Sequence, residues 1–179
     1  MKLLLHTCCA PCALGAVQAL KAAGIDSNDI SLHFYNPNIQ PLTEHEARLS
    51  AFKEVVLSRE YLNDIDNYYC LEKWQEEARN HSAGRCDYCY RSRLEKTAIK
   101  AAEEGFTAFS TTLLISPYQK HEEIRRIGEE LGKEYSIQFF YEDMRPFFRA
   151  GQREAKELGI YMQKYCGCLD SLQSSVVSR

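Results

Sequence analysis

The chain contains 179 residues, 45% of them hydrophobic, with a formal net charge of −3 and an isoelectric point near 6.0. This net charge excludes a protein whose whole surface is basic for binding polyanions. No apolar run approaches the roughly 18 residues of a membrane span. The sequence shows no signal-peptide pattern and no flexible linker. We therefore expect one cytoplasmic domain, residues 1–179, that buries its core without disulfide cross-links.

Strands and helices are predicted to alternate along the chain. An apolar strand is expected at Lys2–His6, and Pro11 then favours the start of a helix that Gly24 ends. A second strand, Ile30–Tyr35, leads into the turn-rich segment Asn36–Pro41. The elements predicted after this turn are a helix at Glu44–Arg59, a strand at Ile65–Tyr69, helices at Leu71–Arg79 and Cys89–Glu104, a strand at Phe106–Ile115, a helix at His121–Tyr135, a strand at Ile137–Tyr141 and a helix at Phe147–Leu158.

This alternation predicts the α/β class: a single domain with a parallel, Rossmann-like sheet, helices on both faces and a short helical C-terminal extension. Ligands of such sheets bind beyond the carboxyl ends of the strands. Three segments that follow predicted strands, Thr7–Cys12, Asn36–Pro41 and Thr111–Gln119, should therefore rim one pocket. The chain has no Gly-x-Gly-x-x-Gly or Walker A motif, so a nucleotide cofactor has no motif support.

Cysteine carries most of the functional signal. Seven of the eight cysteines fall into three tight clusters: Cys8, Cys9 and Cys12; Cys86 and Cys89; and Cys166 and Cys168. Cys70 stands alone, and its position indicates no role. Clustering is compatible with structural zinc, with structural disulfides and with buried cysteines that act as small hydrophobic residues. Because nothing points to secretion, metal binding or redox chemistry is favoured over structural disulfides.

The first two clusters both lie at predicted helix starts, where backbone amides favour thiolate over thiol. Cys-x-x-Cys spacing also lets the sulfurs of Cys86 and Cys89 face one metal centre. By count, the sulfurs of Cys8, Cys9, Cys86 and Cys89 satisfy tetrathiolate zinc and a [4Fe–4S] cluster equally well. Spacing does not separate the two, although adjacent cysteines are unusual in zinc knuckles and favour the cluster.

The third cluster, Cys166-Gly-Cys168, is of a different kind. A disulfide across this spacing closes a very small ring, and strain makes such a bond easier to reduce. The two cysteines are therefore a candidate redox pair. Additional metal ligands and a plain buried pair stay open as alternatives.

Five motifs lie in order along nearly the whole chain, to about Ser171. They are His6-Thr-Cys-Cys-Ala-Pro-Cys12, Asn36-Pro-Asn-Ile-Gln-Pro41, Arg85-Cys-Asp-Tyr-Cys89, Phe109-Ser-Thr-Thr-Leu-Leu-Ile-Ser-Pro117 and Tyr161-Met-Gln-Lys-Tyr-Cys-Gly-Cys168. Together they closely resemble the motifs of the cobalamin-independent epoxyqueuosine reductases. The number and order of the motifs make a chance match implausible.

The resemblance implies an activity and its cofactors. Enzymes of this family reduce the cyclopentane epoxide of epoxyqueuosine, at the wobble position of certain tRNAs, to the alkene of queuosine, which is the last step of queuosine biosynthesis. They bind a [4Fe–4S] cluster beside a second iron, and their terminal Cys-Gly-Cys is a redox-active pair. The resemblance thus implies cluster ligands at Cys8, Cys9, Cys86 and Cys89, and a catalytic redox pair, able to form a disulfide bond, at Cys166 and Cys168.

One position departs from the family pattern, because many members carry Asp where this chain has Cys12. Both carboxylate and thiolate ligate iron. We therefore expect Cys12 to be catalytic by helping to hold the additional mononuclear iron. The alternative is a small buried residue that packs at the helix start.

The partner implied is a tRNA carrying epoxyqueuosine, with an external electron donor that the sequence does not identify and no membrane. The basic stretches Arg85–Lys100 and Arg145–Lys164 read as solvated helix faces from charge alone, but the resemblance favours one phosphate-contacting face. The candidates for contacting the splayed wobble base are Tyr88, Tyr90, Arg91, Arg93 and Tyr165. Two other functions stay open: an iron–sulfur tRNA-thiolating enzyme using ATP, which the missing phosphate loop disfavours, and a zinc-stabilised nucleic-acid-binding module.

Overall fold

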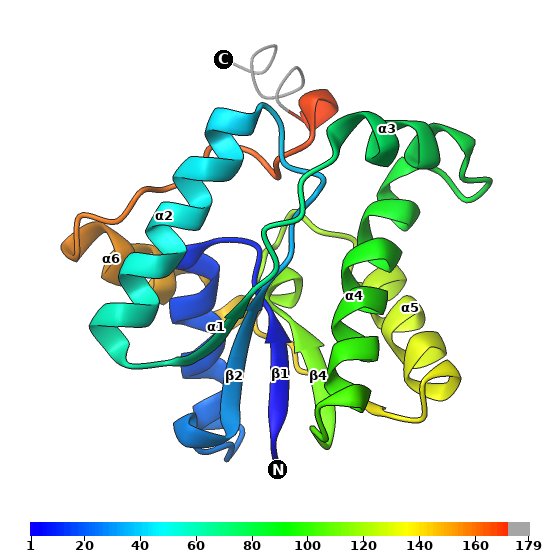
Figure 1. The fold of residues 1–179 in the computed structure, drawn as a ribbon. Helices are drawn as coiled ribbons and strands as arrows, with labels where there is room; N and C mark the ends of the chain where they lie inside the picture. The colour runs from blue at the N-terminus through cyan, green and yellow to red at the C-terminus, as the bar shows by residue number, and fades with distance from the viewer. Residues whose placement is uncertain (172–179) are drawn as a thin grey trace.

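The computed structural model describes residues 1–171 and shows a five-stranded, entirely parallel β-sheet flanked by helices (Figure 1). The strands follow the spatial order β3-β2-β1-β4-β5, which places β1 at the centre of the sheet. The strand bounds are β1 Leu3–His6, β2 Ile30–Phe34, β3 Leu62–Ile65, β4 Ala108–Thr111 and β5 Gln138–Phe139. The predicted parallel, Rossmann-like sheet is confirmed.

Helices cover both faces of the sheet: α1, α2 and α6 lie on one face, and α4 and α5 on the other (Figure 1). Their bounds are α1 Ala10–Ala22, α2 Leu42–Arg59, α3 Leu71–Asn80, α4 Arg85–Glu103, α5 His121–Glu134 and α6 Phe148–Glu157, with 3₁₀ helices η1 Ser27–Asp29, η2 Thr112–Ile115 and η3 Arg145–Phe147. Within residues 1–171, none of these helices combines the length and the apolar character needed to cross a membrane.

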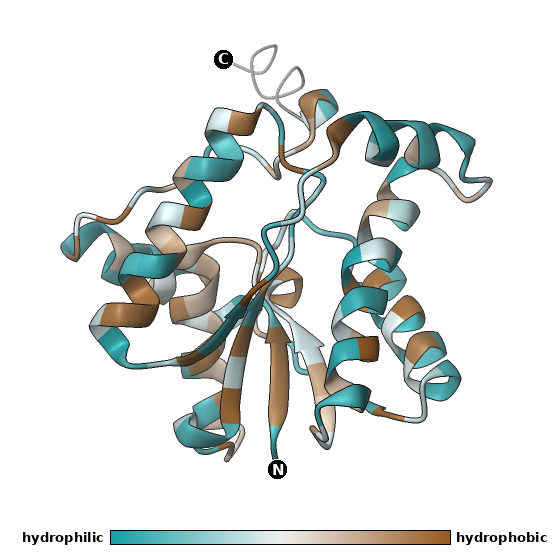
Figure 2. Cartoon of the chain, in the orientation of Figure 1, coloured by the Kyte–Doolittle hydropathy of each residue, from teal (hydrophilic) through white to brown (hydrophobic). Residues whose placement is uncertain are grey.

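The core lies along the central strand. Leu3, Leu4 and Leu5 of β1 are fully buried, as expected for a parallel strand with helices packed on both of its faces. Figure 2 shows the same pattern, with apolar central strands and largely polar outer helices. Because all the strands run in one direction, the loops after β1, β2 and β4 collect at a single edge of the sheet, here called the carboxyl edge.

Three predicted strands differ from the structure in extent, one of them being Ile137–Tyr141, of which only Gln138–Phe139 is a strand. The strand predicted at Ile65–Tyr69 lies earlier, since β3 ends at Ile65. The strand predicted at Phe106–Ile115 ends at Thr111, because the Thr111 hydroxyl accepts a hydrogen bond from the backbone N–H of Leu113 at 3.1 Å and so caps η2. An apolar run therefore continues past the strand as a 3₁₀ turn, which periodicity alone does not distinguish from a longer strand.

The helix predicted at Cys89–Glu104 begins at Arg85 instead. Gly84 precedes it with φ of 92°, a left-handed conformation that glycine adopts without strain and that lets the chain turn sharply into the helix. Both Cys86 and Cys89 consequently belong to the start of α4. The C-terminal extension is helical at residues 169–171, and the remainder of the prediction lies outside the described residues.

Close packing fixes α6 against the start of α1. A Cβ atom on Gly15 would lie 2.8 Å from the carbonyl oxygen of Phe147, and a Cβ on Gly151 would lie 2.5 Å from the carbonyl oxygen of Pro11. Only glycine fits at either position without a shift of the backbone. The two helices therefore approach closely next to the turn that carries the first cysteine cluster.

Candidate metal centre

Three strand ends meet at the carboxyl edge and are joined by His6. Its Nε2 donates to the Tyr35 carbonyl at 3.1 Å, and its Nδ1 accepts from the Thr111 hydroxyl at 2.9 Å. Burial lowers the pKa of His6 to about 3, so the ring is neutral. The Asn36 side chain also links the loops after β1 and β2, because it donates a hydrogen bond to the Thr7 carbonyl at 2.8 Å. The loops after β1, β2 and β4 thus form one rigid rim, as the sequence predicted.

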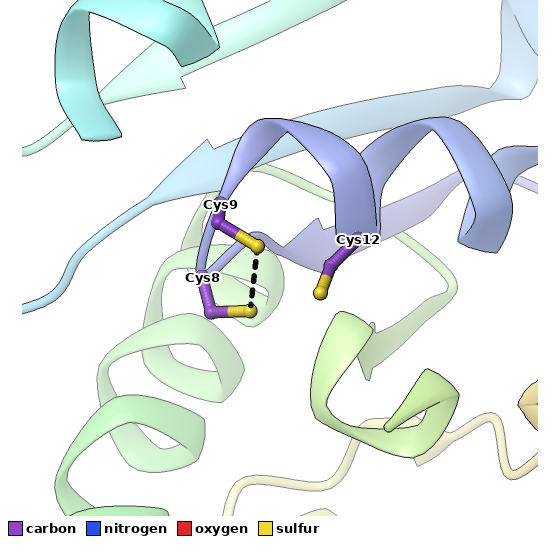
Figure 3. A group of neighbouring side chains, drawn as sticks. All are labelled: Cys8, Cys9 and Cys12. Carbon is purple, nitrogen blue, oxygen red and sulfur yellow. Dashed lines mark hydrogen bonds between the residues drawn. The ribbon is translucent and has the colours of Figure 1, made fainter. Parts of the chain in front are cut away.

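The first cysteine cluster occupies this rim. Cys9 is the N-cap residue of α1, Cys8 precedes it, and Cys12 lies in the first turn beyond Pro11. The three sulfurs lie within 4.8 Å of one another, and those of Cys8 and Cys9 are 3.7 Å apart. Figure 3 shows all three side chains directing their sulfurs toward a common space. Within residues 1–171, this is the one group of three or more Cys, His, Asp or Glu ligand atoms this close together.

The spacing of the sulfurs fits a metal. Thiolates bound to one tetrahedral ion at about 2.3 Å lie about 3.8 Å from each other, close to the Cys8–Cys9 separation. Hydrogen bonds from the Cys12 and Cys9 thiols hold the pKa of Cys8 well below its usual range, and burial raises the pKa of Cys9. The hydrogen bonds to Cys8 and Cys9 raise the pKa of Cys12. A cation bound among these three sulfurs would displace the protons that they carry.

Two polar side chains hydrogen-bond to this triad. The Thr112 hydroxyl donates to the Cys8 sulfur at 3.3 Å and accepts from the Cys8 backbone N–H at 3.0 Å. Gln163 comes from the far end of the chain, and its Nε2 donates to the Cys9 sulfur at 2.7 Å and to that of Cys12 at 3.8 Å. Hydrogen bonds to sulfur ligands orient them and tune the redox potential of a bound iron site.

The second and third cysteine clusters face each other across a separate small cavity. Its lining comprises Cys86, Cys89, Cys166 and Cys168 together with Trp74, Arg85, Tyr90, Arg93 and Gln119. Burial raises the pKa of Cys89 to about 11. Opposing that effect, the Arg93 guanidinium donates to the Cys89 sulfur at 3.1 Å and to its carbonyl at 2.8 Å. The Arg93 cation would therefore stabilise Cys89 as a thiolate once a metal displaces its proton.

The sequence-predicted ligand set is thus divided. The structure brings Cys8 and Cys9 together with Cys12, and it places Cys86 and Cys89 beside Cys166 and Cys168. All of these cysteines lie at the carboxyl edge, on the rim or on the segments packed against it. Cys70 is apart from both groups, at the N-cap of α3. Because all eight cysteines are free thiols, the disulfide expected between Cys166 and Cys168 is not present.

A buried arginine connects the two groups. Arg48 of α2 is 2% exposed, and its guanidinium donates to the carbonyls of Tyr165 at 2.9 Å and Cys166 at 3.3 Å. Its Nε pairs with the Glu44 carboxylate at 2.7 Å. Its charge also opposes the rise in the pKa of Cys9 that burial causes. One cation thus fixes the Cys-Gly-Cys segment and acts on the sulfur triad.

The Asn36–Pro41 loop also holds the Cys-Gly-Cys segment in place. The backbone N–H of Gln40 donates to the Gly167 carbonyl at 2.8 Å, and the Tyr165 hydroxyl donates to the Gln40 carbonyl. Gly167 has φ of 109°, and a Cβ there would lie 2.9 Å from a side-chain carbon of Ile39. The glycine between the two cysteines is therefore required both by its conformation and by its contact with the loop.

Several expected tRNA contacts are engaged inside the protein. Arg93 and Tyr90 are buried, at 3% and 4% exposed, and line the small cavity rather than the outer surface. Arg91 pairs with Glu130 at 2.5 Å, and Tyr165 lies beneath the Arg48 guanidinium. The Tyr88 hydroxyl donates to Glu77. Because the start of α4 turns Arg93 and Tyr90 into the cavity beside Cys86 and Cys89, their contact with the wobble base stays a prediction.

Arg48, Gln163 and Thr112 are site residues that motif spacing does not reveal. Thr112 and Gln163 belong to motifs, but nothing in a motif shows that a threonine or a glutamine reaches a distant sulfur. For Arg48 the only signal is its spacing of four residues from Glu44 on one helix, which predicts an ordinary exposed ion pair. Its burial follows from the C-terminal segment that packs over it.

We expect Arg48→Gln to destabilise the protein by about 3 kcal/mol, because the change leaves the largely buried Glu44 carboxylate without its cation and removes two hydrogen bonds to the Cys-Gly-Cys segment. Arg59→Gln is the matched control on the same helix. It removes the ion pair to Glu154, whose partners are 39% and 24% exposed, and should cost less than about 1 kcal/mol. Urea unfolding of both variants measures the difference. Equal losses of unfolding free energy in the two variants would show that the Arg48–Glu44 pair contributes no more than a surface ion pair.

Comparison with known proteins identifies relatives over the full site. Residues 3–174 match the family model described as "Epoxyqueuosine reductase QueH". Proteins of that name include one from Dehalococcoides mccartyi, 35% identical over 95% of this chain and 92% of its own length, and one from Thermotoga maritima, 37% identical over 94% and 89%. A third, from Haemophilus influenzae, is 32% identical over 97% of this chain and 73% of its own length.

Proposed function

The chain belongs to the epoxyqueuosine reductase QueH family, as the resemblance predicted, and we propose that it performs this reduction with an iron–sulfur cluster and an adjacent iron held by its clustered cysteines. The observation that carries the proposal is that three cysteine motifs, far apart in sequence, lie at the carboxyl edge of one sheet in two groups, Cys8, Cys9 and Cys12 in one and the remaining motif cysteines in the other. The substrate is a tRNA carrying epoxyqueuosine, and the place of action is the cytoplasm, where tRNA is modified.

The reaction removes one oxygen atom. Two C–O bonds of the epoxide break, a C=C bond forms, and two electrons with two protons convert the oxygen to water. When bound, an iron–sulfur cluster with a neighbouring iron supplies one-electron transfer and Lewis acidity toward an oxygen. The protein must therefore provide sulfur ligands, a source of two electrons and two protons, and a place for the wobble base at the carboxyl edge.

We assign Cys8, Cys9, Cys86 and Cys89 as ligands of the cluster, one to each iron, and Cys12 as a ligand of the additional iron. The 3.7 Å between the Cys8 and Cys9 sulfurs is the spacing for a single ion, so cluster binding requires these two sulfurs to separate and the two cysteine pairs to approach each other. Cys12 shares its close group with Cys8 and Cys9, so a metal at its sulfur would adjoin one held by them. The hydrogen bonds from Thr112 and Arg93 to cysteine sulfurs support this assignment, because such donors stabilise thiolates.

Cys166 and Cys168 are assigned as the redox pair. Oxidation of two thiols to a disulfide releases two electrons and two protons, which is the requirement of one turnover. The pair lines the same cavity as Cys86 and Cys89, so electrons need travel only a short distance to a cluster bound there. The Cys166 thiol now donates to the Ser171 hydroxyl at 3.0 Å. An external donor, not identified by the chain, must return the disulfide to the dithiol.

Metal analysis of protein purified without oxygen tests the cofactor assignment. We expect a brown protein with broad visible absorbance, acid-labile sulfide, and more iron than sulfide because of the second iron. A colourless protein with stoichiometric zinc would contradict the proposal and favour a structural metal.

For Cys12, we expect Cys12→Asp to retain the second iron and substantial activity, because carboxylate also ligates iron. Cys12→Ala should lose that iron and keep the four-iron cluster, since alanine offers no ligand. Iron and sulfide per chain, with Mössbauer spectra of both variants, measure the outcome. Unchanged iron and full activity in Cys12→Ala would show that Cys12 only packs at the helix start.

A further inference from the structure

We propose that the exposed face of α6, formed by Arg149, Arg153 and Lys156, binds the phosphate backbone of the tRNA substrate. The inference rests on the proposed function, which supplies the tRNA, and assigns the docking surface for it. It distinguishes the two basic stretches. Among the cations of Arg145–Lys164 only Arg145 forms an ion pair within residues 1–171, whereas most cations of Arg85–Lys100 are paired.

The cations of α4 and its neighbour α5 are mostly neutralised within the protein. The ion pairs are Arg85–Asp170, Arg91–Glu130, Lys96–Asp66, Lys100–Asp64, Lys100–Glu104, Arg125–Glu129, Arg126–Asp87 and Arg126–Glu130. A phosphate that approaches this face meets cations already held by carboxylates. Binding there would require those ion pairs to be exchanged, so the surface offers little net attraction.

The cations of α6 differ in both exposure and pairing. Arg149, Arg153 and Lys156 are exposed, and within residues 1–171 no carboxylate lies within ion-pair distance of any of them. Glu154 of the same helix points elsewhere, because it accepts from Gln18 at 2.6 Å and pairs with Arg59 of α2. Glu157, the second acid of α6, is exposed and has no ion pair within residues 1–171, so this face keeps an excess of positive charge.

The spacing places the three cations on one side of the helix. At 3.6 residues per turn, positions 149, 153 and 156 fall within about 60° of each other around the axis. The opposite side, with Gly151 and Ala155, is buried. Exposed Lys164 follows on the segment that leaves α6 toward the cysteines. Such a row of unpaired cations complements a polyanion backbone.

This face has a fixed relation to the site. Gly151 packs against the Pro11 carbonyl at the turn between Cys9 and Cys12, and the chain beyond α6 reaches Gln163, which donates to the Cys9 sulfur. A stem held by α6 would therefore be anchored next to the edge where its wobble base must enter. In Figure 1 the segment after α6 runs from that helix across to the carboxyl edge.

The test compares two triple variants that remove equal charge. In Arg149→Gln/Arg153→Gln/Lys156→Gln the exposed face of α6 loses its three positive charges, while glutamine preserves the helix. In Lys2→Gln/Lys21→Gln/Lys133→Gln three exposed cations are lost at the opposite edge, before β1 and in the last turns of α1 and α5. These lysines form no ion pair with any residue up to 171. Binding of fluorescein-labelled tRNA carrying epoxyqueuosine is measured by anisotropy, with the metal-loaded protein, across a salt series.

We expect the α6 variant to bind at least tenfold more weakly and to lose about 2 to 3 from the slope of log affinity against log salt, as each lost phosphate contact removes about 0.7 to 0.9. The control should change little. Equal weakening in both variants, or unchanged affinity in the α6 variant, would overturn the inference. Wild-type binding without turnover would refute the proposed function alone, whereas turnover with equal KM values in both variants would refute the docking surface alone.

Discussion

Serine in place of Cys86 is expected to remove most of the bound iron and sulfide and to abolish turnover. A serine hydroxyl is a harder and much less acidic ligand than a thiol, so it does not replace thiolate at an iron–sulfur cluster. Cys86 is exposed at the start of α4, so its substitution should leave the packing of the core unchanged. Iron and sulfide are quantified per chain in protein purified without oxygen, together with the melting temperature.

Cys70→Ser is the matched control for this change. Cys70 lies outside both sulfur groups, at the N-cap of α3, and should keep full iron content and activity when replaced. Full iron and activity in Cys86→Ser would remove Cys86 from the ligand set. Equal losses in Cys86→Ser and Cys70→Ser would show that thiol loss acts through folding rather than through metal binding.

Alanine in place of either Cys166 or Cys168 is expected to lower turnover by more than about 100-fold while the cluster stays bound, because one remaining thiol cannot form the disulfide that releases two electrons. Alkylation followed by mass spectrometry should find two thiols in the wild-type protein that become reactive only after reduction of the oxidised enzyme. Neither variant should show this pair.

The metal content of the Cys168→Ala protein tests whether Cys168 belongs to the redox pair or to the cluster ligands. Because Cys168 lines the same cavity as Cys86 and Cys89, it could itself be a cluster ligand. Loss of cluster iron in Cys168→Ala would make that residue a ligand and not an electron carrier. Retained iron with normal turnover would leave the pair without a role in the reaction.

The parts of the site that were predictable are those set by local chain geometry. Cys8 and Cys12 lie close because one turn separates them, and their place follows from the rule that parallel strands present their carboxyl ends to ligands. The Cys-x-x-Cys spacing likewise brings Cys86 and Cys89 to one helix start. Alternating apolar segments were sufficient for the fold class, since periods of strands and helices differ.

The contacts between distant segments were not predictable from the same signals. Whether Cys86 adjoins Cys9 or Cys168 depends on how the C-terminal segment crosses the carboxyl edge, and no local pattern encodes that path. Arg48 holds this segment, yet in sequence it looks like half of a surface ion pair. Arg93 reads as a solvated cation until the fold places it against the Cys89 sulfur.

The central claim is tested most directly by turnover on the proposed substrate. The metal-loaded protein is incubated without oxygen with tRNA carrying epoxyqueuosine and a chemical reductant, and the digested nucleosides are analysed by mass spectrometry. We predict conversion of epoxyqueuosine to queuosine, lighter by one oxygen atom, and no conversion by Cys86→Ser. Unchanged epoxyqueuosine after incubation with protein shown to hold its full complement of iron and sulfide would contradict the account.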